Sequence, residues 1–78
     1  MWVGYRIDPS KNMYRWYHVD IAPDLWGEWA VWTAWGRLGQ RGRLRVLPVG
    51  TFAEAQAVAD RIITKKKQRG YRHPGWCH

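Results

Sequence analysis

The pattern of apolar and polar positions in the first two thirds of the chain predicts β-strands. Residues 13–20 are rich in aromatic and β-branched side chains and follow an Asp-Pro-Ser turn signal, which favours a strand. A second strand is predicted at about residues 28–35, after a connection at 21–27 that contains proline and ends in glycine. Residues 36–42 hold three glycines and indicate a tight turn, so a third, antiparallel strand is predicted at 43–49.

The last third of the chain changes to a helical period. Thr51 and Glu54 stand in the capping-box arrangement, in which the Thr hydroxyl serves the N3 amide and the Glu carboxylate reaches back to the cap. A helix is therefore predicted to begin near Phe52. Gly70 suits the left-handed residue that ends a helix, and Tyr71 is expected to fold back onto the last turn. Steps of three and four residues place one stripe toward the sheet: Ala55, Val58, Ala59, Ile62 and Lys66.

These elements predict an α+β fold, with a small antiparallel β-sheet of three to five strands packed against one C-terminal α-helix. A chain of 78 residues is too short for two independent cores, so one domain is expected at residues 1–72. Pro74 and Gly75 break regular structure. The chain from Arg72 on is therefore expected to be loose, with a C-terminal tail at residues 73–78.

Composition narrows the class of protein further. Seven tryptophans supply large rings for a core that so short a chain otherwise struggles to build. The single cysteine, Cys77, excludes an intramolecular disulfide and a four-thiolate metal site, which favours a reducing compartment. The sequence shows neither a secretory leader nor an apolar run long enough to span a membrane. We therefore expect a cytoplasmic protein with no membrane partner.

Basic residues gather in the second half of the chain. The 13 Lys and Arg exceed the 6 Asp and Glu and give a net charge of +7. Residues 1–36 carry three basic and four acidic residues, whereas residues 37–72 carry ten basic and two acidic residues, a net charge of +8. Such a concentration is typical of proteins that bind a polyanion, most commonly nucleic acid. The alternative is that the charges only keep a tryptophan-rich protein in solution.

No group of residues predicts an enzyme. No Ser, Cys or Thr stands in a recognisable arrangement with a base and an orienting group, and the carboxylates at residues 20–28 surround a predicted connection. His73, Cys77 and His78 lack a recognised ligand spacing, so neither a metal nor another cofactor is expected.

The glycine-rich segment 36–42 lacks the Lys-Ser/Thr pair of a nucleotide-binding loop and leads into a predicted strand instead of a helix. Its backbone amides and three nearby arginines, Arg37, Arg41 and Arg43, still suit phosphate, because a guanidinium presents a planar fork of donors to phosphate oxygens.

Motifs over most of the chain resemble a known family. The segment WTAWGRLG, followed by the capped helix TFAEAQAVADRIITKKKQRGY, resembles the WGR domain, named for Trp-Gly-Arg, here Trp35, Gly36 and Arg37. The upstream segment NMYRWYHVDIAPDLWGEWAVW is similar to the short bacterial members of that family. The resemblance covers roughly residues 11–72 and implies a small antiparallel sheet packed on one helix.

The resemblance also implies a function. In the DNA-dependent poly(ADP-ribose) polymerases, a WGR domain grips a DNA break near its 5′ end: the motif tryptophan stacks on the terminal sugar, and basic residues meet the phosphate. Matched by motif position, that tryptophan is Trp35, the motif arginine is Arg37, and the lysine near the helix end is Lys66. The motif arginine of those enzymes also touches neighbouring domains, and their catalytic activity is not implied for this chain.

The sequence therefore predicts a non-enzymatic nucleic-acid-binding module, with DNA favoured over RNA, that recognises ends or other structural features through a basic surface and a stacking tryptophan. The alternative is a protein–protein interaction adaptor that uses the same aromatic and arginine patch. The residues expected to bind are Trp35, Gly36, Arg37, Arg41, Arg43, Lys66 and Arg69.

Three of these residues also have a purely structural interpretation. Trp35 shares a predicted strand face with Val31 and Thr33, so it suits the core as well as a ligand contact. Arg37 suits a solvated turn residue or an internal donor to loop carbonyls as well as a phosphate contact. Lys66 lies in the last helical turn, where the helix dipole favours cations even without a ligand.

Overall fold

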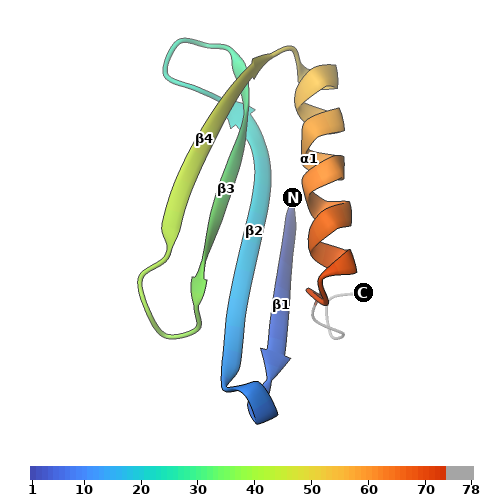
Figure 1. The fold of residues 1–78 in the computed structure, drawn as a ribbon. Helices are drawn as coiled ribbons and strands as arrows, with labels where there is room; N and C mark the ends of the chain where they lie inside the picture. The colour runs from blue at the N-terminus through green and yellow to red at the C-terminus, as the bar shows by residue number, and fades with distance from the viewer. Residues whose placement is uncertain (74–78) are drawn as a thin grey trace.

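Antiparallel pairing of consecutive strands builds one sheet in the order β1-β2-β3-β4, and a helix packs against one of its faces (Figure 1). The computed structural model describes residues 1–73. The elements are β1 (Trp2–Asp8), the 3-10 helix η1 (Pro9–Lys11), β2 (Met13–Pro23), β3 (Trp29–Arg37), β4 (Arg43–Gly50) and α1 (Phe52–Gln68). The predicted α+β architecture is confirmed, with four strands.

The three predicted strands are confirmed as β2, β3 and β4, and β1 is an additional N-terminal strand. Two predicted boundaries are wrong. β2 continues through the expected connection to Pro23, which stands at its last position, where a missing amide proton interrupts no further pairing. β3 continues through Gly36 to Arg37, because Gly36 still pairs with Trp16, so the turn before β4 is shorter than expected.

Helix α1 begins and ends where the sequence predicts. The Thr51 hydroxyl accepts a hydrogen bond from the Glu54 amide at 3.2 Å, which confirms the N-terminal cap. At the other end Gly70 has a φ of 99°, and the amides of Gly70 and Tyr71 each donate to a carbonyl of the last helical turn at 3.0 Å. These two bonds form a Schellman motif, which turns Tyr71 back onto the helix as expected.

The hydrophobic core lies between α1 and the middle of the sheet. Its buried members are Trp2, Val19, Val31, Ala55, Ala59, Ile63 and Tyr71. Ile63 was not part of the predicted stripe, whereas Ile62 of that stripe is only half buried, because the contact face of the helix is wide enough to include both neighbours. The core does not include the paired positions Arg6, Arg15 and Arg37 at the η1 end of the sheet.

The segment after α1 is attached to β1. The backbones of Tyr5 and Arg72 exchange two hydrogen bonds of 2.8 Å each, and His73 Nδ1 lies 2.9 Å from the carbonyl oxygen of Val3. The expectation of a loose chain is therefore wrong for Arg72 and His73, because the edge of β1 offers backbone groups that a returning segment satisfies. Residues 74–78 of the predicted tail lie outside the described residues, and the domain boundary at residue 72 stays a prediction.

Candidate nucleic-acid interface

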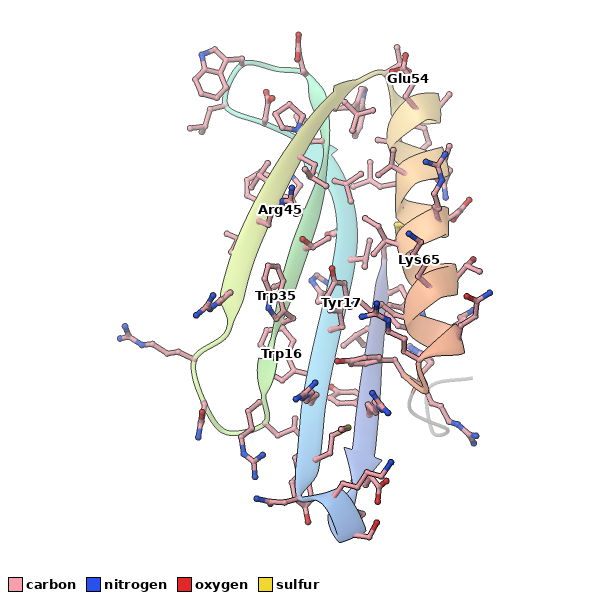
Figure 2. All side chains as sticks on the ribbon, viewed as in Figure 1. Trp16, Tyr17, Trp35, Arg45, Glu54 and Lys65 are labelled. Carbon is pink, nitrogen blue, oxygen red and sulfur yellow. The ribbon has the colours of Figure 1, made fainter. Side chains whose placement is uncertain are left out.

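An open cleft of about 800 Å³ lies between the C-terminal half of α1 and the η1 end of the sheet. All four strands and the helix contribute basic side chains to it: Arg6, Arg15, Arg37, Arg45, Lys65, Lys66 and Arg69. No carboxylate of residues 1–73 is among its lining groups. In Figure 2, Trp35 and Tyr17 lie side by side, with Arg45 on β4 above Trp35 and Lys65 on α1 beyond Tyr17. The cleft therefore concentrates positive charge around an aromatic floor.

Strand alternation and register bring these residues to one face of the sheet. Tyr17 of β2 pairs with Trp35 of β3, and Val19, two residues further along β2, belongs to the core beneath α1. Residues two apart on a strand point to the same face, so the aromatic pair lies on the helix side. The next row on that side joins Arg6 to Arg15, and α1 does not bury this row.

Trp35 lies at the cleft and not in the buried core. Its indole stacks on the Tyr17 ring, with centroids 5.9 Å apart and planes inclined by 17°. Tyr71 in turn meets the Tyr17 ring edge-on at 6.1 Å. Trp35 is half buried and lines the cleft, whereas Tyr71 belongs to the buried cluster. This position suits a stacking contact, and the ligand contact itself stays a prediction.

Lys66 is held over the same aromatic group. Its ammonium nitrogen lies 4.4 Å from the ring centroid of Tyr17 and 5.6 Å from that of Tyr71. Partial burial, and then the positive charge of Arg69, lower the pKa of Lys66 below its ordinary value of 10.5. The electron-rich ring faces offset part of the cost of removing this cation from water. A phosphate bound beside Lys66 would offset more of this cost than the rings do, because opposite charges attract more strongly where the effective dielectric constant is low.

Arg37, the motif arginine, makes internal hydrogen bonds. Its two terminal nitrogens donate to Asn12, one to the carbonyl oxygen and one to the side-chain oxygen, each at 3.0 Å. Its guanidinium carbon also lies 5.4 Å from the ring centroid of Tyr14. Arg37 is therefore an internal hydrogen-bond donor, as one interpretation of the sequence expected. Its two bonds link the end of β3 to Asn12, just before β2. A guanidinium has five N–H donors, so contact with a phosphate stays a prediction.

Gly36, the motif glycine, is required by space and not by an unusual backbone angle. A Cβ at this position would lie 2.9 Å from the Cα of Gly42 and 3.4 Å from the indole nitrogen of Trp16. A Cβ at Gly42 would in turn lie 2.7 Å from the carbonyl oxygen of Trp35. The two glycines thus let β3 and the start of β4 approach closely beside Trp35.

The cleft brings together five of the seven residues that the sequence singled out: Trp35, Gly36, Arg37, Lys66 and Arg69. Arg41 lies in the turn between β3 and β4, and Arg43 begins β4 opposite Trp35. Both arginines are exposed, and neither lines the cleft. Their predicted role in binding remains untested.

Sequence reasoning did not single out the other residues that line the cleft; among them are four basic residues, Arg6, Arg15, Arg45 and Lys65, and the aromatic Tyr17. Arg6 and Arg15 come from the half of the chain that has no excess of positive charge, so the charge distribution along the chain pointed away from them. Arg15 and Tyr17 lie four and two positions before the apolar Val19, so on a strand they point to the same face as Val19. This spacing could have identified both residues from the sequence.

Among residues 1–73, no three His, Cys, Asp or Glu side chains gather in an arrangement that could hold a metal ion. Cys77 and His78 of the metal cluster considered from the sequence lie outside the described residues. No helix in the same part of the chain has the length and apolar character needed to cross a membrane.

Fold and cleft together define a small α+β binding domain with a basic, aromatic cleft. The family model of the WGR domain matches residues 4–75, and the chain belongs to the WGR domain family. The resemblance identified from the sequence is thereby confirmed. WGR domains are binding modules of the nucleic-acid-binding type.

A longer bacterial protein is a relative of this chain. The uncharacterized protein y4dW of Sinorhizobium fredii (strain NBRC 101917 / NGR234) is 37% identical over 67 residues, which cover 86% of this chain and 33% of the relative. The chain thus spans about a third of the length of this curated relative. No solved structure matches the chain.

Proposed function

We propose that this protein binds DNA in the cleft beside α1 and recognises a strand end or another structural feature, with Trp35 as the stacking platform. The observation that carries the proposal is the cleft itself. Seven Arg and Lys side chains line it, without a carboxylate among its described lining residues, around the stacked rings of Trp35 and Tyr17. The cations can bind phosphate groups, and the Trp35 ring can stack on a terminal sugar or base.

The arrangement favours recognition of structure over recognition of sequence. Stacking on an aromatic ring tolerates every base, because every base has a flat face. Arginine forks and lysine ammonium groups attract phosphate oxygens, which are the same in every nucleotide. We therefore expect affinity to depend on strand ends or single-stranded character and to depend little on base composition.

Fluorescence anisotropy tests the proposal directly. Labelled blunt duplexes with and without a 5′ phosphate, single-stranded DNA and single-stranded RNA are titrated with the protein over a series of salt concentrations. If four of the seven cations each neutralise one phosphate of a duplex, log affinity should fall with log salt at a slope of about −3.6. A salt-independent affinity, or no binding at moderate salt, would rule out the mechanism. Tighter binding of RNA than of any DNA would reassign the ligand.

Replacing Lys66 by glutamine should weaken binding and make the salt slope less steep by about 0.9, because one phosphate contact is lost. Lys67→Gln is the matched control, since Lys67 lies in the same helical turn, is exposed and does not line the cleft. The two variants are compared in the same anisotropy series. Equal slopes for both would show that Lys66 makes no specific phosphate contact.

A protein-interaction role is the second candidate, and one observation favours it. Leu25 and Trp26, in the loop between β2 and β3 and far from the cleft, are 90% and 82% exposed. Their loop is nevertheless held in shape, because the Asp24 carboxylate accepts from the amides of Trp26 at 2.8 Å and Glu28 at 3.0 Å. Affinity purification with and without nuclease separates the two roles, since an adaptor keeps its partners after nuclease treatment.

A further inference from the structure

The face of the sheet opposite α1, here called the outer face, is not covered by a helix of residues 1–73. Directly paired residues of an antiparallel sheet share a face, and residues alternate along each strand. The outer face therefore comprises the odd positions 3–7 of β1 and the even positions 14–22 of β2, 30–36 of β3 and 44–48 of β4. Its rows place Tyr5 beside Trp16, Ile7 beside Tyr14, and Trp32 beside Val46.

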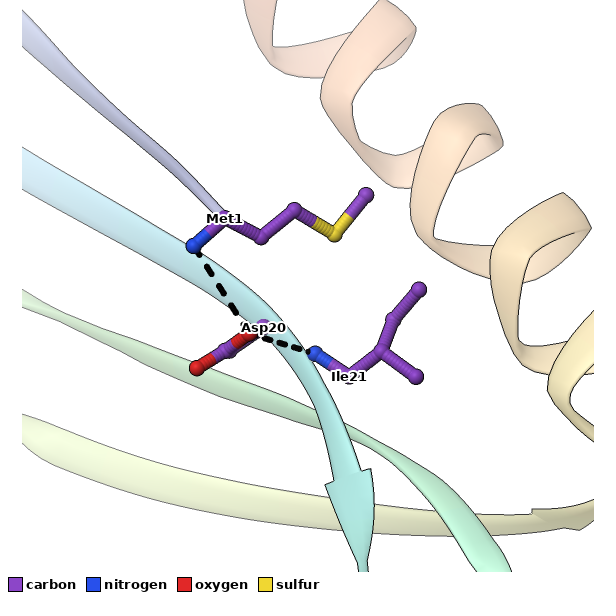
Figure 3. Close-up of polar contacts among 3 residues, drawn as sticks. All are labelled: Met1, Asp20 and Ile21. Carbon is purple, nitrogen blue, oxygen red and sulfur yellow. Dashed lines mark hydrogen bonds and ion pairs between the residues drawn. The ribbon is translucent and has the colours of Figure 1, made fainter.

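The outer face has the composition of a buried surface. One charged residue, Asp20, stands on it, in a chain in which 24% of residues are charged. The Asp20 carboxylate already accepts from the Ile21 amide at 2.8 Å and lies 3.6 Å from the amino group of Met1 (Figure 3). Ile7 and Leu44 are 55% and 63% exposed. An antiparallel sheet with one side in water usually places polar residues on that side, so this face is suited to contact with another apolar surface.

We propose that the outer face is the interface of a homodimer in which two copies of this chain pack sheet against sheet. Charge decides where two copies can meet. Each copy carries a net charge of +7, so two copies repel each other most strongly through their cationic surfaces, and the strand positions of the outer face hold no Lys or Arg. Trp35 and the cationic row of Arg6 and Arg15 point to the helix side. Back-to-back contact therefore keeps the two basic clefts apart, facing in opposite directions.

Geometry agrees with this arrangement. Two sheets pack face to face at a separation of about 10 Å, with side chains of the two inner faces interdigitating. Four strands paired over about seven residues give a flat footprint of roughly 450 Å² per copy at ordinary strand spacing. Interdigitating rings add to this area. The surface buried on both copies together therefore approaches the roughly 1,000 Å² that a specific interface needs. A twofold axis brings the same face of both copies together, and a dimer with one twofold axis is the commonest kind of homo-oligomer.

Sedimentation equilibrium without nucleic acid tests the dimer, at protein concentrations from about 5 to 300 µM, since an interface of this size is at the weak end of specific association. Leu44→Glu places a carboxylate on the outer face and should raise the dissociation constant at least about tenfold, because two copies would bury unpaired charges against each other. Leu25→Glu is the matched control, since Leu25 is 90% exposed in the loop between β2 and β3. Circular dichroism checks that both variants are folded.

The proposal expects a wild-type dimer that Leu44→Glu dissociates and Leu25→Glu leaves intact. Added salt should strengthen this dimer by screening the repulsion between the two copies, which is the opposite of its effect on nucleic-acid binding. Trp35→Ala should leave the dimer unchanged, so the test is independent of the function of the cleft. A wild-type monomer throughout the concentration range would overturn the proposal. So would a dimer that Leu25→Glu dissociates while Leu44→Glu does not.

Discussion

Replacing Trp35 by alanine should weaken binding of a DNA end about 5- to 150-fold, which corresponds to the roughly 1–3 kcal/mol of one base–aromatic stack. The indole lies at the cleft, half buried and stacked on Tyr17 at 5.9 Å, and it stands outside the buried core cluster. The variant should therefore lose the stacking platform and keep the fold. Fluorescence anisotropy on a blunt, 5′-phosphorylated duplex measures the loss, and circular dichroism confirms the fold.

The matched control for this variant is Trp26→Ala. Trp26 is 82% exposed in the loop between β2 and β3, at the opposite end of β3 from Trp35. Its removal deletes an identical side chain from the same domain without touching the cleft, so the affinity should stay within about twofold of wild type. Trp35→Phe keeps a smaller ring and should bind with intermediate affinity. If the two tryptophan-to-alanine variants bound equally well, Trp35 would not be the stacking platform.

Replacing Tyr71 by alanine should lower the free energy of unfolding by about 3–5 kcal/mol, the range for deleting a buried aromatic ring. Tyr71 is 8% exposed, packs edge-on against Tyr17 at 6.1 Å and lies 5.6 Å from the Lys66 ammonium. It therefore connects the core to the aromatic floor of the cleft. Small domains are stable by only about 5–15 kcal/mol, so this loss is a large part of the total.

Urea titration followed by circular dichroism measures this loss. Tyr71→Phe is the control, because it keeps the ring and its packing and should stay within about 1 kcal/mol of wild type. We also expect Tyr71→Ala, studied at low temperature where it is folded, to bind DNA more weakly than Tyr71→Phe, since Tyr17 and Lys66 lose their support. An unchanged unfolding midpoint for the alanine variant would contradict the placement of Tyr71 in the core.

The features that the sequence predicted correctly depend on residues close together along the chain. The cap at Thr51 and the helix end at Gly70 each involve neighbours within about one helical turn, so their identities are sufficient to place them. The strand residues 13–20 were recognised from composition alone. The WGR motif was recognised in the same way, as a contiguous string of residues.

Where the sequence misled, a distant partner decided the outcome. Arg72 was expected to be loose, but it pairs with Tyr5, a residue at the other end of the chain. Gly36 was expected to lie in a turn, but its pairing with Trp16 extends β3. For Arg37 the sequence left an internal-donor role open, and the structure supplies the partner, Asn12, which no pattern near the motif indicates.

By itself, the sequence determined the fold class, the ends of the helix, the family and the excess of positive charge. Only the tertiary structure decided which residues form the cleft and which form the outer face. Strand parity with Val19 marks Arg15 as a residue of the helix side, but Arg6 joins Arg15 and Trp35 only through the antiparallel register of β1 on β2. Register depends on how whole strands pair and pack against α1, and the residues next to Arg6 in the chain do not reveal these non-local contacts.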